Sequence, residues 1–112
     1  MNLFIQLSAR EDILNQYRYY LDEAAIDAAE RFLLAADASI HALVEMPEIG
    51  VAKKSKNRHL AGLRIWQVSG FDEFWIYYLV RSDVLQVVRV LHGKRDIGKI
   101  LKHQPVDSPD ID

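Results

Sequence analysis

Basic side chains that could bind an anion occur in two parts of this sequence. The first part is a polar stretch that contains Lys53, Lys54, Lys56, Arg58 and His59. The second part surrounds apolar, strand-like runs and contains Arg64, Arg89, His92, Lys94 and Arg95. Cations grouped in this way could contact phosphate or an acidic protein surface, and a histidine could also exchange a proton near neutral pH.

Purely structural roles are also open for these residues. Loops between a helix and a sheet often collect charge, so the polar stretch could simply be solvated. An arginine within an apolar strand must reach solvent or pair with an acid, because an isolated buried charge is prohibitively costly. For Arg64 and Arg89 the candidate acids are Glu11, Asp12 and Asp96. His92 would instead form a hydrogen bond with a neighbouring carbonyl or with Asp96.

The composition excludes several kinds of site. The 112 residues contain no cysteine, which rules out disulfides, thiolate metal sites and a cysteine nucleophile. His41, His59 and His103 are not spaced as metal ligands usually are, so we expect neither a metal nor a cofactor. Charges interrupt every apolar run before it reaches the length of a membrane span, and we therefore expect a cytoplasmic protein.

Charge is distributed unevenly along the chain. Residues 1–50 carry three basic and nine acidic side chains, residues 51–103 carry eleven basic and four acidic ones, and the last nine residues add three aspartates. This asymmetry predicts a polarised surface with one face suited to an anionic partner. The net charge of −2 argues against indiscriminate binding of nucleic acid, which needs a clearly basic domain.

Two helices are predicted for the first half of the chain. A short β run at residues 3–7 is followed by Ser8 and Glu11, which have the spacing of a capping box at a helix start. Apolar residues then recur at three- and four-residue steps over 13–24 and again over 29–44, which is typical of amphipathic helices. The short link between the two segments predicts an antiparallel helical hairpin.

A sheet is predicted for the second half of the chain. A polar loop over residues 47–62 precedes three strand-like runs, at 63–68, 74–80 and 84–91. Asp96 could cap a last short helix that ends at Leu101. The predicted fold class is therefore α+β with the order β-α-α-β-β-β. An antiparallel sheet packs against the N-terminal helical hairpin, and the first strand lies at an edge.

One domain is expected to fill most of the chain. Residues 1–103 form it, because a chain of this length supports a single hydrophobic core. Residues 104–112 contain two prolines and three aspartates and are expected to be disordered. We expect a chain that lacks this acidic tail to keep its fold.

Several short segments carry a family resemblance when their order and spacing are taken together. They are LSAREDI at residues 7–13, AAERFL at 28–33, MPEIG at 46–50, LAGLR at 60–64 and RVLHGKRD at 89–96. Over residues 3–101 the chain resembles the RelE/ParE superfamily, the toxin halves of bacterial type II toxin–antitoxin modules. The long helical hairpin and the LHGKRD ending look more like ParE than RelE.

The resemblance to ParE implies a toxin that poisons DNA gyrase without catalysis of its own. It also implies a cognate antitoxin that neutralises the toxin in a hetero-oligomer, and no membrane partner. The residues expected to contact the target, as a basic rim beside the sheet, are Arg64, Arg89, His92, Lys94 and Arg95. An amphipathic segment of the antitoxin would lie across the helices and the sheet, by pairing with a sheet edge or by docking as a helix.

Two alternatives stay open. RelE-like toxins cut mRNA on the ribosome, which needs a base for the ribose 2′-hydroxyl, cations at the phosphate and an acid for the leaving oxygen. The residues at matching places are Lys53, Lys54, Arg64, His92 and Arg95, but the C-terminal tyrosine of RelE is missing. The other alternative is a degenerate family member that binds an antitoxin and has lost its toxicity.

Overall fold

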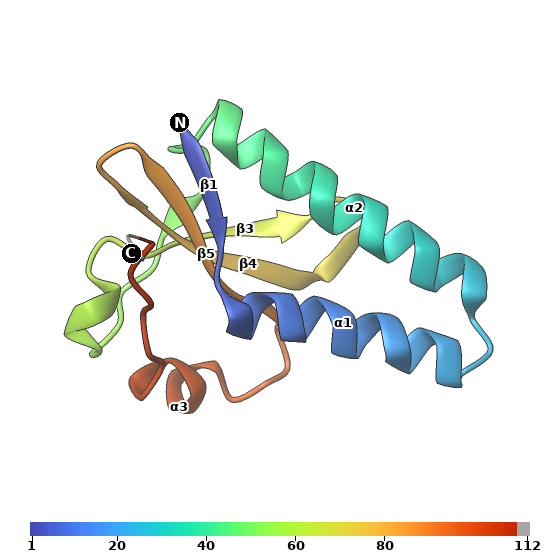
Figure 1. Cartoon of the computed structure of the whole chain (residues 1–112). Helices are drawn as coiled ribbons and strands as arrows, with labels where there is room; N and C mark the ends of the chain where they lie inside the picture. The colour runs from blue at the N-terminus through green and yellow to red at the C-terminus, as the bar shows by residue number, and fades with distance from the viewer. Residues whose placement is uncertain (110–112) are drawn as a thin grey trace.

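The elements of the fold follow the predicted order, with two small additions. The computed structural model describes residues 1–109. Its elements are β1 (Asn2–Ile5), α1 (Leu7–Asp22), α2 (Ile26–Glu45), β2 (Val51–Ala52), the 3₁₀ turn η1 (Arg58–Leu60), β3 (Arg64–Val68), β4 (Phe71–Arg81), β5 (Val84–His92) and α3 (Ile97–Lys102) (Figure 1). The predicted α+β class is confirmed. β2 and η1 fall inside the predicted loop, because elements this short leave no periodic pattern in a sequence.

The five strands form one sheet in the order β1-β5-β4-β3-β2. Strands β2 to β5 pair antiparallel, as predicted for the second half of the chain. β1 takes the expected edge position but pairs with β5 in parallel, with Leu3 opposite Leu85 and Ile5 opposite Val87. The sheet is therefore mixed rather than wholly antiparallel. The parallel direction is possible because the chain from α1 to β4 forms the long crossover that a parallel pair needs.

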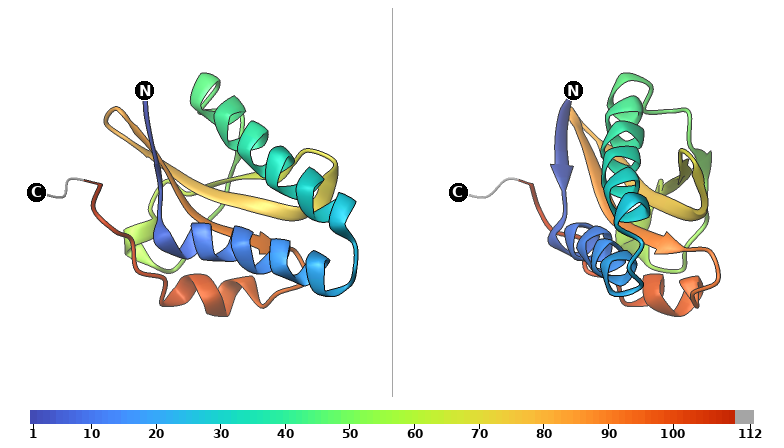
Figure 2. Two further views of the ribbon diagram at one scale, coloured as in Figure 1. Left: turned by 45° about the vertical axis from the view of Figure 1, so that its right-hand side comes forward. Right: turned by 90° about the vertical axis from the view of Figure 1, so that its right-hand side faces the viewer.

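Helices α1 and α2 form the predicted hairpin and pack on one face of the sheet, whereas α2 and α3 lie on opposite sides of the strands (Figures 1 and 2). The hairpin is anchored by aromatic rings. Phe32 on α2 meets Phe71 and Phe74 on β4 edge to face, with ring centroids 5.3 and 5.1 Å apart. Such pairs add about 0.5–1.5 kcal/mol each beyond the burial of their area. Within residues 1–109, no helix is both long and apolar enough to cross a membrane.

The start of α1 differs from the predicted capping box. The N-cap is Gln6, Ser8 already lies inside the helix, and no side chain caps the first turn. The Ser8 hydroxyl instead donates a hydrogen bond to the carbonyl of Val88 on β5, at 2.8 Å. Ser8 therefore ties the helix to the sheet, a long-range contact that the local spacing of Ser8 and Glu11 could not indicate.

The other face of the sheet is covered by η1, α3 and the chain that follows α3. Its core consists of Leu60, Leu63, Tyr77, Leu79, Val88, Leu91 and Leu101. The Asp96 carboxylate accepts a hydrogen bond from the backbone N–H of Lys99 at 3.2 Å, so the predicted cap of the last helix is confirmed. The sheet is therefore covered on both faces, by the helical hairpin on one and by η1, α3 and the following chain on the other.

The chain after α3 is held in place by hydrogen bonds over residues 104–107, here called the C-terminal strap. Gln6 Nε2 donates to the carbonyl of Pro105 at 2.8 Å, and Gln6 Oε1 accepts from the N–H of Asp107 at 3.0 Å. Gln86 Nε2 donates to the carbonyl of Asp107 at 2.8 Å. Because Gln6 and Gln86 are buried, the strap satisfies polar groups that water cannot reach. The part of the expectation of disorder that concerns residues 110–112 lies outside the described residues.

Candidate functional site

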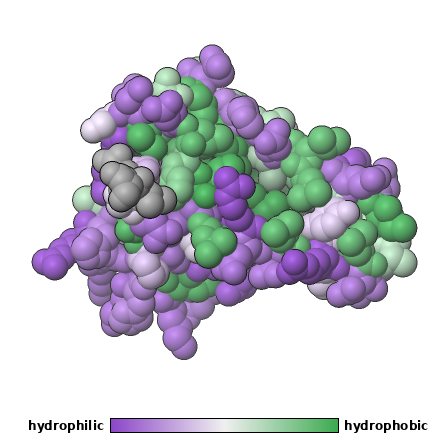
Figure 3. Space-filling model, viewed as in Figure 1, coloured by the Kyte–Doolittle hydropathy of each residue, from purple (hydrophilic) through white to green (hydrophobic). Residues whose placement is uncertain are grey.

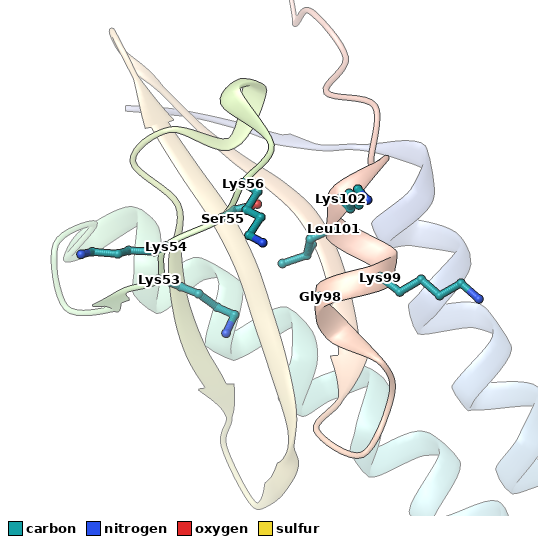
Figure 4. A pocket seen from close by; sticks show the side chains of 8 residues that line it. All are labelled: Lys53, Lys54, Ser55, Lys56, Gly98, Lys99, Leu101 and Lys102. Carbon is teal, nitrogen blue, oxygen red and sulfur yellow. The ribbon is translucent and has the colours of Figure 1, made fainter.

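Five lysines surround a cleft on the face of the sheet opposite α2. The cleft has a volume of about 460 Å³ and is lined by Lys53, Lys54, Ser55, Lys56, Gly98, Lys99, Leu101 and Lys102. One wall is the loop that follows β2, and the other wall is α3 (Figure 4). We call this feature the five-lysine cleft. The sequence drew attention to the loop lysines, but nothing in it indicated that Lys99 and Lys102 would lie opposite them.

Backbone and amide hydrogen bonds fix the two walls of the five-lysine cleft. The N–H of Lys53 donates to the carbonyl of Leu63 at 2.9 Å, which holds the start of the loop on the sheet. The buried amide of Asn57 donates to the carbonyls of Leu101 and Gln104, at 2.9 and 3.0 Å. Asn57 therefore joins the end of the loop directly to the C-terminal end of α3, and the cleft exists without a ligand.

The five-lysine cleft is strongly cationic. No acidic side chain of residues 1–109 lines it. Among residues 1–109, none of its five lysine side chains takes part in an ion pair or a hydrogen bond. In Figure 4 the side chains of Lys54 and Lys99 point outward, while Lys56 and Leu101 face the space between the walls. The arrangement is suited to an anionic ligand that is larger than the cleft itself.

Arg89 is engaged in an ion pair with Asp12, one of the three acids that the sequence offered. Arg89 Nε and Nη2 lie 2.7 and 2.8 Å from the two carboxylate oxygens of Asp12 on α1, and Nη1 donates to Gln104 Oε1 at 2.9 Å. The hydrogen bond that Arg89 donates to Asp12 is the main reason why the pKa of Arg89 lies above its usual value. With its donors directed inward, Arg89 is a link between α1 and β5.

Arg64 holds the turn between α2 and β2. It lies opposite Tyr78 in the β3–β4 pair, and its Nη1 donates to the carbonyls of Gly50 and Glu48, at 2.7 and 3.3 Å. Tyr78 supports the same turn, since its hydroxyl donates to the carbonyl of Pro47 and accepts from the N–H of Gly50. Burial raises the pKa of Tyr78. None of the acids proposed from the sequence pairs with Arg64.

His92 and Arg95 lie beside α1, at the end of β5. His92 Nδ1 accepts a hydrogen bond from the N–H of Lys94 at 3.0 Å, and Nε2 lies 3.2 Å from a carboxylate oxygen of Glu73. Its ring packs edge to face on Phe74, with centroids 5.1 Å apart. Two adjoining hollows of about 300 and 210 Å³, here called the α1–β5 cleft, are lined by Asp12, Asn15, Gln16, Tyr19, Tyr20, Glu73, Phe74, Val90, Leu91, His92 and Arg95.

The residues predicted to bind a target do not form one basic rim. Arg64 lies opposite Tyr78 and His92 lies opposite Phe74, on the two strands that flank β4. Four residues of a strand span about 13 Å, so the two side chains mark separate places on the sheet. Arg89 is paired with an acid, and only His92, Lys94 and Arg95 stay together.

The set proposed for RelE-like chemistry is divided in the same way. Lys53 and Lys54 line the five-lysine cleft, His92 and Arg95 line the α1–β5 cleft, and Arg64 is bound to backbone carbonyls. Sequence reasoning also missed Tyr19, an exposed aromatic residue of the α1–β5 cleft, because half-buried and exposed tyrosines look alike in a helical stripe. Within residues 1–109, no three His, Asp or Glu side chains gather as a metal site would require.

Comparison with known proteins identifies the family. A family model described as the ParE toxin of type II toxin–antitoxin system, parDE, matches residues 3–97. Among solved structures, a chain of the chromosomal ParDE TA system from P. aeruginosa has a similar fold, with a TM-score of 0.67 and 17% sequence identity over 82% of this chain and 95% of that chain. No curated protein sequence gave a match. The resemblance seen in the sequence is thus confirmed, and this chain belongs to the ParE toxin family of type II toxin–antitoxin systems.

Proposed function

We propose that this toxin arrests growth in the cytoplasm by binding DNA gyrase through the α1–β5 cleft, and that a cognate antitoxin neutralises it. The observation that carries the proposal is the division of the candidate catalytic residues between separate places. An RNA-cleaving site needs its base, its cations and its acid within hydrogen-bond reach of one phosphate. Here the lysines and His92 line different clefts, and Arg64 is committed to the turn after α2.

The α1–β5 cleft has the composition of a protein-binding surface. Tyr19 is 55% exposed on α1, and Arg95 is exposed beside it. Tyrosine and arginine are enriched among the residues that dominate binding energy at protein interfaces. His92 is held by Lys94, Glu73 and Phe74, so little side-chain freedom would be lost when a partner packs on it.

A separate apolar stripe on α1 supports the antitoxin proposal. Leu7, Leu14 and Leu21 recur every seven residues, and their side chains are 64%, 44% and 38% exposed. Leucines at this spacing lie near one line along a helix. An apolar line of this kind is a suitable docking surface for an amphipathic helix of a partner. Figure 3 shows hydrophobic side chains among hydrophilic ones over α1 and between β1 and α2. We propose that the antitoxin docks on this leucine stripe.

The gyrase proposal is tested with purified, antitoxin-free protein on supercoiled plasmid. We expect gyrase-linked linear DNA to accumulate with the wild type and to be reduced at least tenfold by the double variant His92→Gln, Arg95→Gln. Arg31→Gln is the matched control, because Arg31 is exposed on α2 and its ion pair with Asp27 lies at the surface. Circular dichroism confirms that each variant is folded. Cleavage of mRNA on ribosomes by a protein without effect on gyrase would overturn the proposal.

The antitoxin proposal has its own matched pair of variants. Leu14→Arg places a charge in the leucine stripe, and Leu34→Arg places one at an exposed position on α2. We expect Leu14→Arg to weaken binding of the co-expressed antitoxin at least tenfold, measured by calorimetry, and Leu34→Arg to bind as the wild type does. Equal affinity for both variants would exclude the stripe as the docking surface.

A further inference from the structure

The five-lysine cleft is left unused by the proposed contact with gyrase. We infer that this cleft binds the phosphodiester backbone of duplex DNA, so that the toxin holds the DNA segment on which gyrase acts while the α1–β5 cleft contacts the enzyme. The role in the gyrase complex rests on the proposed function. Binding of DNA by the cleft itself does not, and it can be measured on the toxin alone.

The first argument is the lack of internal neutralisation. Arg89 and Arg31 each have an acidic partner, Asp12 and Asp27, whereas the five lysines of the cleft have none among residues 1–109. Such lysines attract mobile counterions, and a phosphate backbone that replaces these ions releases them into solution. The favourable entropy of that release drives the binding of polyanions and makes it depend steeply on salt.

The second argument is preorganisation. The N–H of Lys53 fixes the loop wall to Leu63, the residue before β3, and the amide of Asn57 fixes it to the C-terminal end of α3. Leu101 is 2% exposed and forms an apolar base beneath the lysines. A ligand would therefore order lysine side chains but would not have to order the backbone, which lowers the cost of binding.

The third argument is the chemical class of the ligand. Proteins that bind single-stranded nucleic acid usually stack bases on aromatic side chains, and the lining of this cleft has none. A duplex presents phosphates and no free bases, so lysines alone suffice to hold it. The uneven charge adds an orientation, because residues 1–50, which contain the helical hairpin, carry nine acidic and three basic side chains. An acidic hairpin is repelled by DNA, and the basic half then turns toward it.

The test measures binding of fluorescein-labelled duplex DNA of about 20 base pairs by anisotropy, at several salt concentrations. If four lysines contact phosphates, the affinity of the wild type falls about 100-fold between 50 and 200 mM salt. The double variant Lys56→Gln, Lys102→Gln removes one lysine from each wall. We expect it to lose only about tenfold over the same range, and to bind at least tenfold more weakly at 50 mM salt.

The matched control is Arg18→Gln, Arg31→Gln, which removes the same charge from exposed positions on α1 and α2. We expect it to bind DNA within a factor of two or so of the wild type, as local rather than net charge decides the contact. Equal losses in the two double variants would overturn the proposal. Failure of the wild type to bind the duplex would do so as well. If single-stranded RNA of the same length bound more tightly than the duplex, and its binding depended on the lysines, the ligand of the cleft would be RNA rather than DNA.

A gyrase assay separates this inference from the proposed function. If the wild type binds DNA but causes no gyrase-linked cleavage, the gyrase contact is wrong and DNA binding by the cleft stands. If gyrase is poisoned equally by the wild type and by Lys56→Gln, Lys102→Gln at physiological salt, the cleft has no role in the complex. We expect the variant to need at least tenfold more protein for the same amount of linear DNA.

Discussion

Arg89 on β5 and Asp12 on α1 form a two-point ion pair that is largely shielded from solvent. Their side chains are 17% and 10% exposed, and the two N–O distances are 2.7 and 2.8 Å. Asp12 also accepts the backbone N–H of Val90 at 2.9 Å. One carboxylate thus joins the helix to a strand side chain and to the strand backbone, beyond the point where β1 ceases to pair with β5.

The first prediction concerns this ion pair. Asp12→Asn leaves the Arg89 charge without its partner in a poorly solvated place, which costs about 2–4 kcal/mol of unfolding free energy. Asp27→Asn is the matched control, because the Asp27–Arg31 pair has the same chemistry at the surface and contributes about 0.5 kcal/mol or less. Urea denaturation of both variants measures the difference. Equal losses would mean that Arg89 finds another partner or reaches solvent.

The second prediction concerns Gly50 and Tyr78. A Cβ atom at Gly50 would overlap the hydroxyl end of Tyr78, which itself bonds the backbone on both sides of the turn. Gly50→Ala must therefore displace a buried ring, at a cost of about 1–3 kcal/mol. Gly98→Ala meets no atom within 4 Å and lies within α3, so it is expected to stabilise the protein by about 0.5–1 kcal/mol. Opposite signs for the two variants in thermal melting would bear out this reasoning.

Local patterns in the sequence were sufficient for most of the elements. The two helices, the three long strands and the Asp96 cap all depend on periodicity and nearest neighbours, which a sequence displays directly. Strand β4 begins at Phe71 instead of residue 74, because the turn before it needs only Ser69 and Gly70, whose φ of 80° suits glycine. Boundaries of this kind are set by pairing with neighbouring strands.

Long-range contacts decided what the sequence could not show. The sequence predicts Ser8 as part of a helix cap, whereas in the structure its hydroxyl donates a hydrogen bond to β5. Lys99 and Lys102 of α3 line the five-lysine cleft only because folding brings α3 opposite the loop that follows β2. Arg89 was correctly limited to three possible acids, but the choice of Asp12 depends on how α1 crosses the sheet. Residues that are far apart in sequence form one site only when the chain has folded. A single sequence does not show which of them the topology brings together.

The third prediction revises the expectation that the tail can be removed. A chain that ends at His103 loses the strap, which leaves the buried amides of Gln6 and Gln86 without their main-chain partners. Unsatisfied buried polar groups cost about 1–3 kcal/mol each, so we expect the melting temperature to fall by about 10 °C or more. The matched truncation removes residues 110–112 only and keeps the hydrogen bonds by which Pro105 and Asp107 contact Gln6 and Gln86. An unchanged melting temperature for both truncations would show that water can replace the strap.

The last prediction concerns stability at alkaline pH. Tyr77 is 3% exposed, and its burial raises its pKa above the ordinary value of 10.0. Above pH 10 the tyrosine of the unfolded chain loses its proton while that of the folded chain keeps it, so the unfolded state is favoured. The free energy of unfolding should therefore decrease with pH in this range, by up to about 1.4 kcal/mol per pH unit for each such tyrosine.

Tyr77→Phe separates this effect from general alkaline unfolding. The substitution keeps the ring in the core formed with Leu60 and Leu101 and removes the proton that titrates. Urea midpoints from pH 8 to 11 should fall less steeply in Tyr77→Phe than in the wild type, and Tyr19→Phe, at an exposed position, should follow the wild type. Parallel curves for all three proteins would mean that the Tyr77 hydroxyl ionises as readily in the folded chain as in the unfolded one, and that this face of the sheet admits water.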